Sequence, residues 1–291
     1  MMTPATLGLP DAPSERMQCM EVWGGNSDVD KAFEMPGLQA WIYSRPHGGS
    51  RAGGDVYYLS SCASGRISRM LLADVSGHGH EVAELAKGLR ELMRKNVNVI
   101  RQTRFVEGMN RQFSEMSEHG TFATALVATY FQPARRLSVC RAGHPHPLLF
   151  DASHNRWSVL HDGQSDAAGI ANLPLGLHDQ TVYEQTETKL CVGDMVLLYS
   201  DALIEARDGQ GEQLGTEGLF RLVADLKADT PASLLKQLLG AIDTGHPENA
   251  GQDDLTVILC RVTGTATTLR DNLLAPFRLF RCVGDSTSLR S

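Results

Sequence analysis

Acidic residues stand at the ends of apolar segments in four separate parts of the chain. Asp55 follows two glycines, Asp74 ends one apolar run before a glycine-rich turn, Asp201 ends another, and Asp253 and Asp254 come just before a third. Each segment alone is also typical of an ordinary turn. If strands bring the four together at one end of a sheet, the repulsion among their carboxylates is relieved by cations. Together they therefore predict a site for divalent metal.

Short runs of β-favouring residues flank these acids and predict the strands that position them. Segment 162–173 has no clear period and is expected to be a loop. The expected strands cover residues 38–44, 55–62, 67–73, 123–131, 137–142, 148–150, 157–160, 181–190, 195–199 and 255–262.

Apolar residues at helical spacing predict two pairs of helices, over 82–93 with 105–116 and over 216–227 with 231–244. Pro231 occupies a first-turn position after Thr230, which is a suitable cap for the last helix. Strands, a helix pair, more strands, a second helix pair and a closing strand predict an α+β fold. We expect a four-layer αββα sandwich of two mostly antiparallel sheets flanked by helix pairs.

The length of 291 residues allows one folded domain with flanking segments. Residues 1–36 carry prolines and glycines with little periodicity and are expected to be an N-terminal extension. Residues 37–263 form the predicted domain, and residues 264–291 a C-terminal tail. The apolar residues of the tail favour a short helix packed on the body, or else a docking segment.

Composition excludes several classes of function. Lys and Arg number 27 against 34 Asp and Glu, and the net charge of −7 opposes binding to nucleic acid. The six cysteines are widely spaced without a CxxC pair, which predicts reduced thiols. No signal-peptide pattern is present and no run approaches the ~18 apolar residues that cross a bilayer. We therefore expect a cytoplasmic protein with no membrane partner.

The ordered set of motifs resembles a known family, the metal-dependent protein phosphatases (PPM, protein phosphatase 2C-like). It is most similar to their bacterial SpoIIE/RsbU-like branch, over residues 38–263. The motifs, in chain order, are Gly-Gly-Asp55, Asp74-Val-Ser-Gly-His-Gly, Ala-Gly-His144-Pro, Pro174-Leu-Gly, Gly193-Asp-x-x-x-Leu-Tyr-Ser-Asp201 and Asp253-Asp-Leu-Thr.

The resemblance implies a set of ligands for two Mn²⁺ or Mg²⁺ ions. Asp74 would bridge both ions and is the central catalytic residue. Asp201 and Asp253 would complete one site, and Asp55 with the backbone carbonyl of Val75 the other. Water would fill the remaining positions, as is usual for hard ions with incomplete protein cages.

Four further positions qualify this set. Asp254 matches a place beside the ligands, although an error of one register would exchange it with Asp253. His78 is a candidate to protonate the leaving serine oxygen, or else it faces solvent or caps a helix. Tyr58 stands where the family often has Asp, and Ala202 where Gly is usual. These two departures bear on metal affinity and on the number of ions.

Two roles are possible for each of the basic residues near the motifs. Arg45 and Arg51 precede Asp55 and would either steer phosphate or lie solvated at the surface. His144 and His146 would shape a loop beside the site, or serve only as turn residues.

Such a site hydrolyses phosphate esters without a phospho-enzyme. Two ions ~3.5–4 Å apart activate a water near neutral pH and stabilise the in-line transition state. The resemblance implies a protein phosphoserine or phosphothreonine as substrate, on a STAS-type anti-sigma-factor antagonist in a partner-switching pathway, with a regulatory protein as a further partner.

Two alternatives use the same architecture. One is a catalytically weak scaffold that binds phosphoproteins, and the other is a phosphomonoesterase for small molecules. Turnover of phosphopeptides and of sugar phosphates, with and without Mn²⁺, separates the three.

Overall fold

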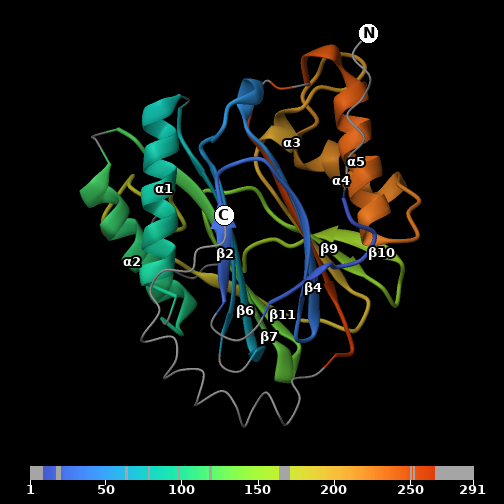
Figure 1. The fold of residues 1–291 in the computed structure, drawn as a ribbon, viewed down its shortest axis with the longest axis horizontal. Coiled ribbons are helices and arrows are strands. Elements are labelled where there is room, and N and C mark those ends of the chain that lie inside the picture. The colour runs from blue at the N-terminus through green and yellow to red at the C-terminus, as the bar shows by residue number, and fades with distance from the viewer. Residues whose placement is uncertain are drawn as a thin grey trace.

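The computed structural model describes residues 9–17, 21–62, 65–77, 79–97, 99–117, 120–163, 171–249, 251 and 253–265. Within these residues two β-sheets pack face to face and helices cover both outer faces (Figure 1). All strand pairs are antiparallel except the short β1–β3 pair. The predicted α+β sandwich of four layers is confirmed.

One sheet has seven strands in the order β1-β3-β4-β13-β12-β9-β10. These are β1 (Glu15–Arg16), β3 (Val29–Met35), β4 (Leu38–Arg45), β13 (Leu255–Val262), β12 (Met195–Tyr199), β9 (Leu148–Asp151) and β10 (Arg156–Val159). The other sheet has six strands in the order β11-β8-β7-β6-β5-β2. These are β11 (Gln185–Lys189), β8 (Arg136–Ala142), β7 (Ala123–Phe131), β6 (Ile67–Val75), β5 (Asp55–Cys62) and β2 (Val22–Gly25).

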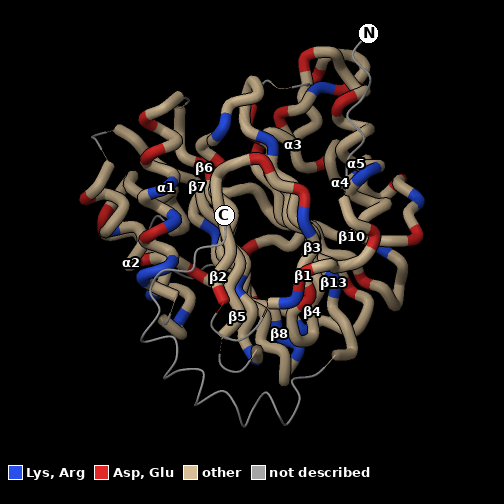
Figure 2. Tube along the Cα trace, in the orientation of Figure 1, with Lys and Arg blue, Asp and Glu red and all other residues tan. Residues whose placement is uncertain are grey.

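Helices α1 (His80–Lys95) and α2 (Gln102–Met116) pack on the six-stranded sheet. Helices α3 (Ala202–Glu205), α4 (Gly215–Asp225) and α5 (Pro231–Gly245) cover the seven-stranded sheet. Short 3₁₀ turns cover His47–Gly49, Gln132–Ala134 and Pro247–Asn249. Basic residues and glutamates are interspersed along α1 and α2 (Figure 2), as expected for helices with one solvated face.

The apolar core has three parts, one between the sheets and one under each helical layer. Strand β6 shows how one sequence serves two of them. Met70 and Leu72 point into the space between the sheets, while Leu71 and Ala73 point to α1 and α2. Neighbouring side chains of a strand face opposite ways. Burial on both faces therefore explains why every residue from Met70 to Ala73, just before Asp74, is apolar.

The cap predicted for α5 is confirmed, because the Ser233 amide donates to Thr230 Oγ1 at 3.1 Å. The start of the fold differs from the prediction, since β1, β2 and β3 all lie within residues 1–36. Strand β2 has the sequence Val-Trp-Gly-Gly, which carries no alternating pattern. A Cβ on Gly24 would lie 2.5 Å from the Tyr57 carbonyl oxygen, so glycine is needed for this strand to approach β5.

Three other expectations are refined. Strand β11 begins at Gln185 rather than at residue 181, and α3 has no counterpart in the prediction. Part of the expected loop at 162–173, and the tail from residue 266, lie outside the described residues. No helix in the described part of the chain is long and apolar enough to cross a membrane.

Candidate metal centre

Two of the predicted ligands face each other on adjacent strands of the six-stranded sheet. Asp55 begins β5 and pairs in register with Asp74 near the end of β6. Directly opposed residues point to the same face, with Cβ atoms about 4.5–5.5 Å apart. Asp55 is only 3% exposed, and the hydroxyl side chains of Thr256 and Ser200 on the other sheet lie near enough to its carboxylate to oppose the rise in its pKa. A buried carboxylate in that state is suited to a cation.

The turn before Asp55 depends on its two glycines. A Cβ on Gly53 would collide with the Asp254 carboxylate, and one on Gly54 would lie 2.9 Å from the carbonyl oxygen of Val75. The Gly54 amide donates to Asp254 Oδ2 at 2.5 Å, and the His47 amide to Oδ1 at 2.6 Å. Asp254 thus holds the turn that carries Asp55.

The other two predicted ligands come from the seven-stranded sheet. Asp201 lies two residues after β12, and Asp253 lies two residues before β13, the neighbouring strand. Ser200 and Thr256 lock these strand ends together. The Ser200 amide donates to the Thr256 carbonyl and the Thr256 amide to Ser200 Oγ, each at 2.9 Å. Asp201 and Asp253 therefore emerge at one end of their sheet.

Electrostatics shows that the acids of the two sheets act on one another. Burial raises the pKa of Asp74 to about 7, with further contributions from Asp201, Asp253, Asp254 and Glu205. The charges of acids beside the seven-stranded sheet thus reach Asp74 and disfavour its ionised form.

The other two shifted carboxyls show the same pattern. Burial raises the pKa of Asp201 to about 6, with Glu205 and Asp253 adding to the shift. Burial also raises the pKa of Asp55 well above its usual value, and the charge of Asp74 raises it further.

The donor set fits divalent cations that keep part of their water. Among the described residues no three Asp, Glu, His or Cys side chains lie together closely enough to hold a metal ion by themselves. Mg²⁺ ordinarily takes one or two protein carboxylates and retains several waters. Two carboxylates from each sheet and the carbonyl of Val75 are the oxygen donors that such ions use.

Glu205 is an acid that sequence reasoning missed. It ends α3, four residues after Asp201, and its amide donates to the Asp201 carbonyl at 2.9 Å. The only signal in the sequence is this i, i+4 spacing, which four residues of helix are too short to reveal. A pocket of about 270 Å³ adjoins the acids and is lined by Ala202, Glu205, Ala206, Arg207, Gln213, Asn249, Asp253 and Leu255.

His144 joins the two sheets beside the acids. It is 1% exposed; Nδ1 lies 2.8 Å from Thr124 Oγ1 and Nε2 lies 3.0 Å from the Tyr199 carbonyl oxygen. Thr124 pairs in register with Asp74. Burial lowers the pKa of His144 to about 3, so the ring is neutral, with Nε2 donating and Nδ1 accepting. The carbonyl of His146 accepts from the Tyr199 hydroxyl at 2.6 Å, which fixes the same loop.

The other residues singled out in the sequence do not join the acids in the described part of the structure. His78 is outside the described residues. Arg45 pairs with Asp243 of α5 at 3.0 Å, which directs its charge to the helical layer, whereas Arg51 is exposed. Tyr58 is 1% exposed and packs under α1 and α2.

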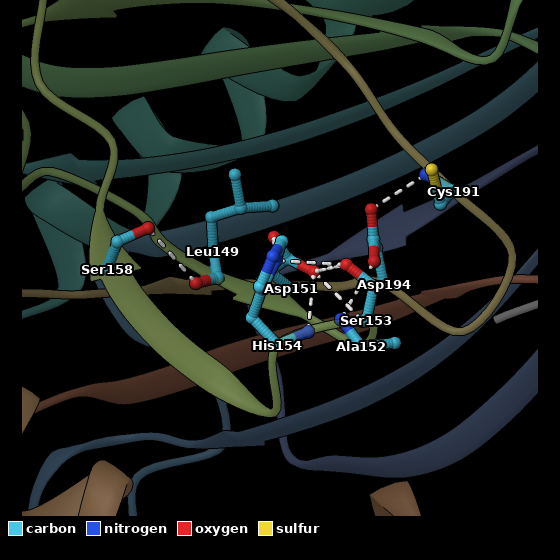
Figure 3. Close-up of polar contacts among 8 residues, drawn as sticks. All are labelled: Leu149, Asp151, Ala152, Ser153, His154, Ser158, Cys191 and Asp194. Carbon is cyan, nitrogen blue, oxygen red and sulfur yellow. Dashed lines mark hydrogen bonds and ion pairs between the residues drawn. The ribbon is translucent and has the colours of Figure 1, made fainter.

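Asp194, the first acid of the Gly193-to-Asp201 motif, lies at the opposite end of β12. Figure 3 shows its carboxylate between two loops. Oδ1 accepts from the Ala152 amide at 2.9 Å and Oδ2 from the Cys191 amide at 2.7 Å. Asp194 therefore fastens the far end of the strand that delivers Asp201.

The sandwich, with acids of both sheets at one end, is the architecture implied by the resemblance to metal-dependent protein phosphatases. The chain belongs to the SpoIIE family, since the family model described as Stage II sporulation protein E matches residues 64–263. The phosphoserine phosphatase RsbU of Bacillus subtilis (strain 168) is 23% identical over 191 residues, covering 65% of this chain and 54% of RsbU. The chain thus spans about half the length of that relative.

Solved structures share the fold. The RsbU and RsbW domains of Rv1364c from Mycobacterium tuberculosis superpose with a TM-score of 0.64 at 23% identity, covering 83% of this chain and 64% of that one. RsbX in complex with magnesium superposes with a TM-score of 0.59 at 14% identity, covering 81% of this chain and 100% of RsbX.

Proposed function

We propose that the chain is a metal-dependent protein serine/threonine phosphatase. The observation that carries the proposal is the buried Asp55 carboxylate, which lies directly across from Asp74. Asp201 and Asp253 approach from the second sheet. Membership of the SpoIIE family and the similarity to a phosphoserine phosphatase support this reaction.

Two Mn²⁺ or Mg²⁺ ions fit the donor set. Asp74 would contact both, Asp201 and Asp253 one, and Asp55 with the Val75 carbonyl the other. When bound, the ions supply a water activated for direct attack on phosphorus and offset the charge of the phosphate. The magnesium complex of RsbX supports the choice of a hard divalent ion.

The surrounding residues hold this set in place. Asp254 fixes the Gly53–Gly54 turn through two backbone amides. His144 remains neutral and links the end of β12 to β7, next to Asp74. Neither group needs to exchange a proton with the substrate. His78 is proposed as the group that protonates the leaving serine oxygen.

The proposed substrate is a phosphoserine or phosphothreonine on a STAS-type anti-sigma-factor antagonist in the cytoplasm. The RsbU relative and the Rv1364c chain, which contains RsbU and RsbW domains, support a place in partner switching. A regulatory protein is a further proposed partner. The pocket beside Asp253 would receive the substrate chain next to the phosphorylated residue.

The test is a Mn²⁺-dependent assay of the wild type and Asp74→Asn on phosphorylated antagonist proteins. We expect a loss of turnover of about a hundredfold or more, without unfolding, because the carboxylate shared by both ions is lost. Asp225→Asn, at the exposed end of α4, is the matched control and should keep full turnover.

Near-normal turnover of Asp74→Asn would exclude the mechanism. Binding of the phosphoprotein without turnover by the wild type would favour the scaffold. Faster hydrolysis of sugar phosphates than of phosphopeptides would favour the small-molecule hydrolase.

A further inference from the structure

Asn26, in the loop between β2 and β3, contacts two separate parts of the candidate site. Its side chain is buried, with 7% of the residue exposed. Nδ2 donates to the carbonyl oxygens of Gly53 and Ala83, each at 3.0 Å. Its own backbone carbonyl accepts from the Gly53 amide at 2.8 Å. Asn26 therefore binds Gly53 through both the amide and the carbonyl of that glycine.

These contacts hold the turn that carries Asp55 from the side opposite Asp254. Gly53 lies between Asn26 and the Asp254 carboxylate, and Gly54 donates to that carboxylate at 2.5 Å. The Gly54 carbonyl accepts from the Val75 amide at 3.3 Å. The position of the turn thus depends on Asn26 on one face and on Asp254 on the other.

The second contact fixes the start of α1. Ala83 lies in the first turn of this helix, which follows the strand end carrying Asp74. A Cβ on Gly54 would lie 3.1 Å from Val82 Cγ1, so the helix packs closely on the Asp55 turn. One amide side chain therefore couples the two chain segments that hold Asp55 and Asp74.

The loop that bears Asn26 is itself anchored to β5. The Tyr57 hydroxyl donates to the Ser27 carbonyl at 3.1 Å, and Gly25 pairs in register with Tyr57. A Cβ on Gly25 would lie 2.7 Å from that hydroxyl oxygen, so a larger residue here would displace the end of the Tyr57 side chain. This segment precedes residues 64–263, which the family model matches.

We propose that Asn26 is a positioning residue, which holds the Asp55 turn and the start of α1 at the spacing that metal binding requires. The inference rests on the proposed function, because it assigns Asp55 and Asp74 to the same metal centre. A carboxylate at this position cannot donate and would place negative charge against two carbonyl oxygens. The metal centre would then lose its spacing while the sandwich keeps its other contacts.

The test compares full-length wild type, Asn26→Asp and Asn26→Ala by Mn²⁺ calorimetry and by amide hydrogen exchange. We expect Mn²⁺ affinity to fall about tenfold or more in both variants, as for loss of groups that orient metal ligands. Exchange should become faster at Gly53, Gly54 and the first turn of α1. Asn26→Ala introduces no charge, so it keeps the test decisive if Asn26→Asp does not fold.

Asn110→Asp is the matched control. Asn110 is fully buried on α2; Nδ2 donates to the carbonyls of His178 and Asp179, and Oδ1 accepts from the Gly176 amide. This substitution should lower the unfolding temperature and leave Mn²⁺ affinity unchanged. Wild-type affinity in both Asn26 variants, or an equal loss in Asn110→Asp, would overturn the inference.

The outcome is distinguishable from failure of the proposed function. If the wild type binds Mn²⁺ but hydrolyses no phosphopeptide, the function fails and the affinities still decide the role of Asn26. If the wild type binds no Mn²⁺, both the function and the metal-positioning role are overturned, and hydrogen exchange shows whether Asn26 orders the turn for structure alone.

Discussion

Asp253 and Asp254 are adjacent in the sequence, yet their carboxylates have different surroundings. Both oxygens of Asp254 accept backbone amides, from His47 and Gly54. Asp253 is exposed and lines the pocket. Its charge also raises the pKa of Asp74 and of Asp201, although burial and one other acid contribute more to each shift. This difference favours Asp253 as the metal ligand and Asp254 as the residue that orders the turn.

The two acids should therefore respond differently to the same substitution. Asp253→Asn is expected to lower turnover about a hundredfold even at saturating Mn²⁺, because a ligand is lost. Asp254→Asn should raise the Mn²⁺ concentration for half-maximal turnover about tenfold, but at saturating Mn²⁺ this variant should keep most of the wild-type turnover. Mn²⁺ titration of both variants measures this, and the reverse order would exchange their roles.

His144 makes stability depend on pH. Its folded-state pKa of about 3 lies below the usual histidine value of 6.5, so the unfolded chain takes up a proton that the folded chain does not. As the pH falls through about 6.5, stability falls by up to about 1.4 kcal/mol per pH unit from this group. His144→Gln should be less stable at pH 7 but should show a shallower decline between pH 6 and pH 4.

Urea unfolding of both proteins across this range measures the two slopes. Carboxyl groups contribute to both slopes alike, so only the difference between them reports on His144. Equal slopes would show that the ring is not held neutral between Thr124 and Tyr199.

At the scale of elements, glycines decide how closely the strands and turns approach one another. A Cβ on Gly53 would collide with the Asp254 carboxylate, whereas one on Gly240 of α5 would meet no atom within 4 Å. Gly53→Ala should therefore weaken Mn²⁺ binding and destabilise the chain. Gly240→Ala should stabilise it by about 0.5–1 kcal/mol, because alanine favours a helix interior. Thermal unfolding and Mn²⁺ calorimetry test the pair, and similar effects at both sites would contradict this account.

Elements with a strong apolar pattern could be predicted from the sequence. Strands β6, β12 and β13 each contain an apolar run because both of their faces are buried along it. The cap at Thr230 also identified α5. Strand β2 was missed because Gly24 and Gly25 serve close backbone approach and carry no alternation. Helix α3 was missed because four residues show no period.

At the scale of the whole molecule, the candidate site joins two sheets that otherwise meet mainly through apolar side chains. Asp55 and Asp74 belong to the six-stranded sheet, and Asp201 and Asp253 flank strands of the seven-stranded one. The sequence could suggest these acids because each lies at or beside one end of an apolar strand. It could not reveal the roles of Asn26 or Glu205, since neither residue belongs to a motif and both act through contacts that only the fold creates.

This placement predicts that metal binding stabilises the whole sandwich. Ions held by carboxylates from both sheets link them, and ligands that bind only the folded state add RT ln(1 + [L]/Kd) to stability, about 2.7 kcal/mol at a hundred times Kd. The unfolding temperature of the wild type should therefore rise with Mn²⁺ and fall again with a chelator. Asp74→Asn should already be stabilised in the absence of metal, because it removes one of several repelling charges, and should gain little from Mn²⁺. An equal gain in both proteins would mean that the ions bind elsewhere and do not join the sheets.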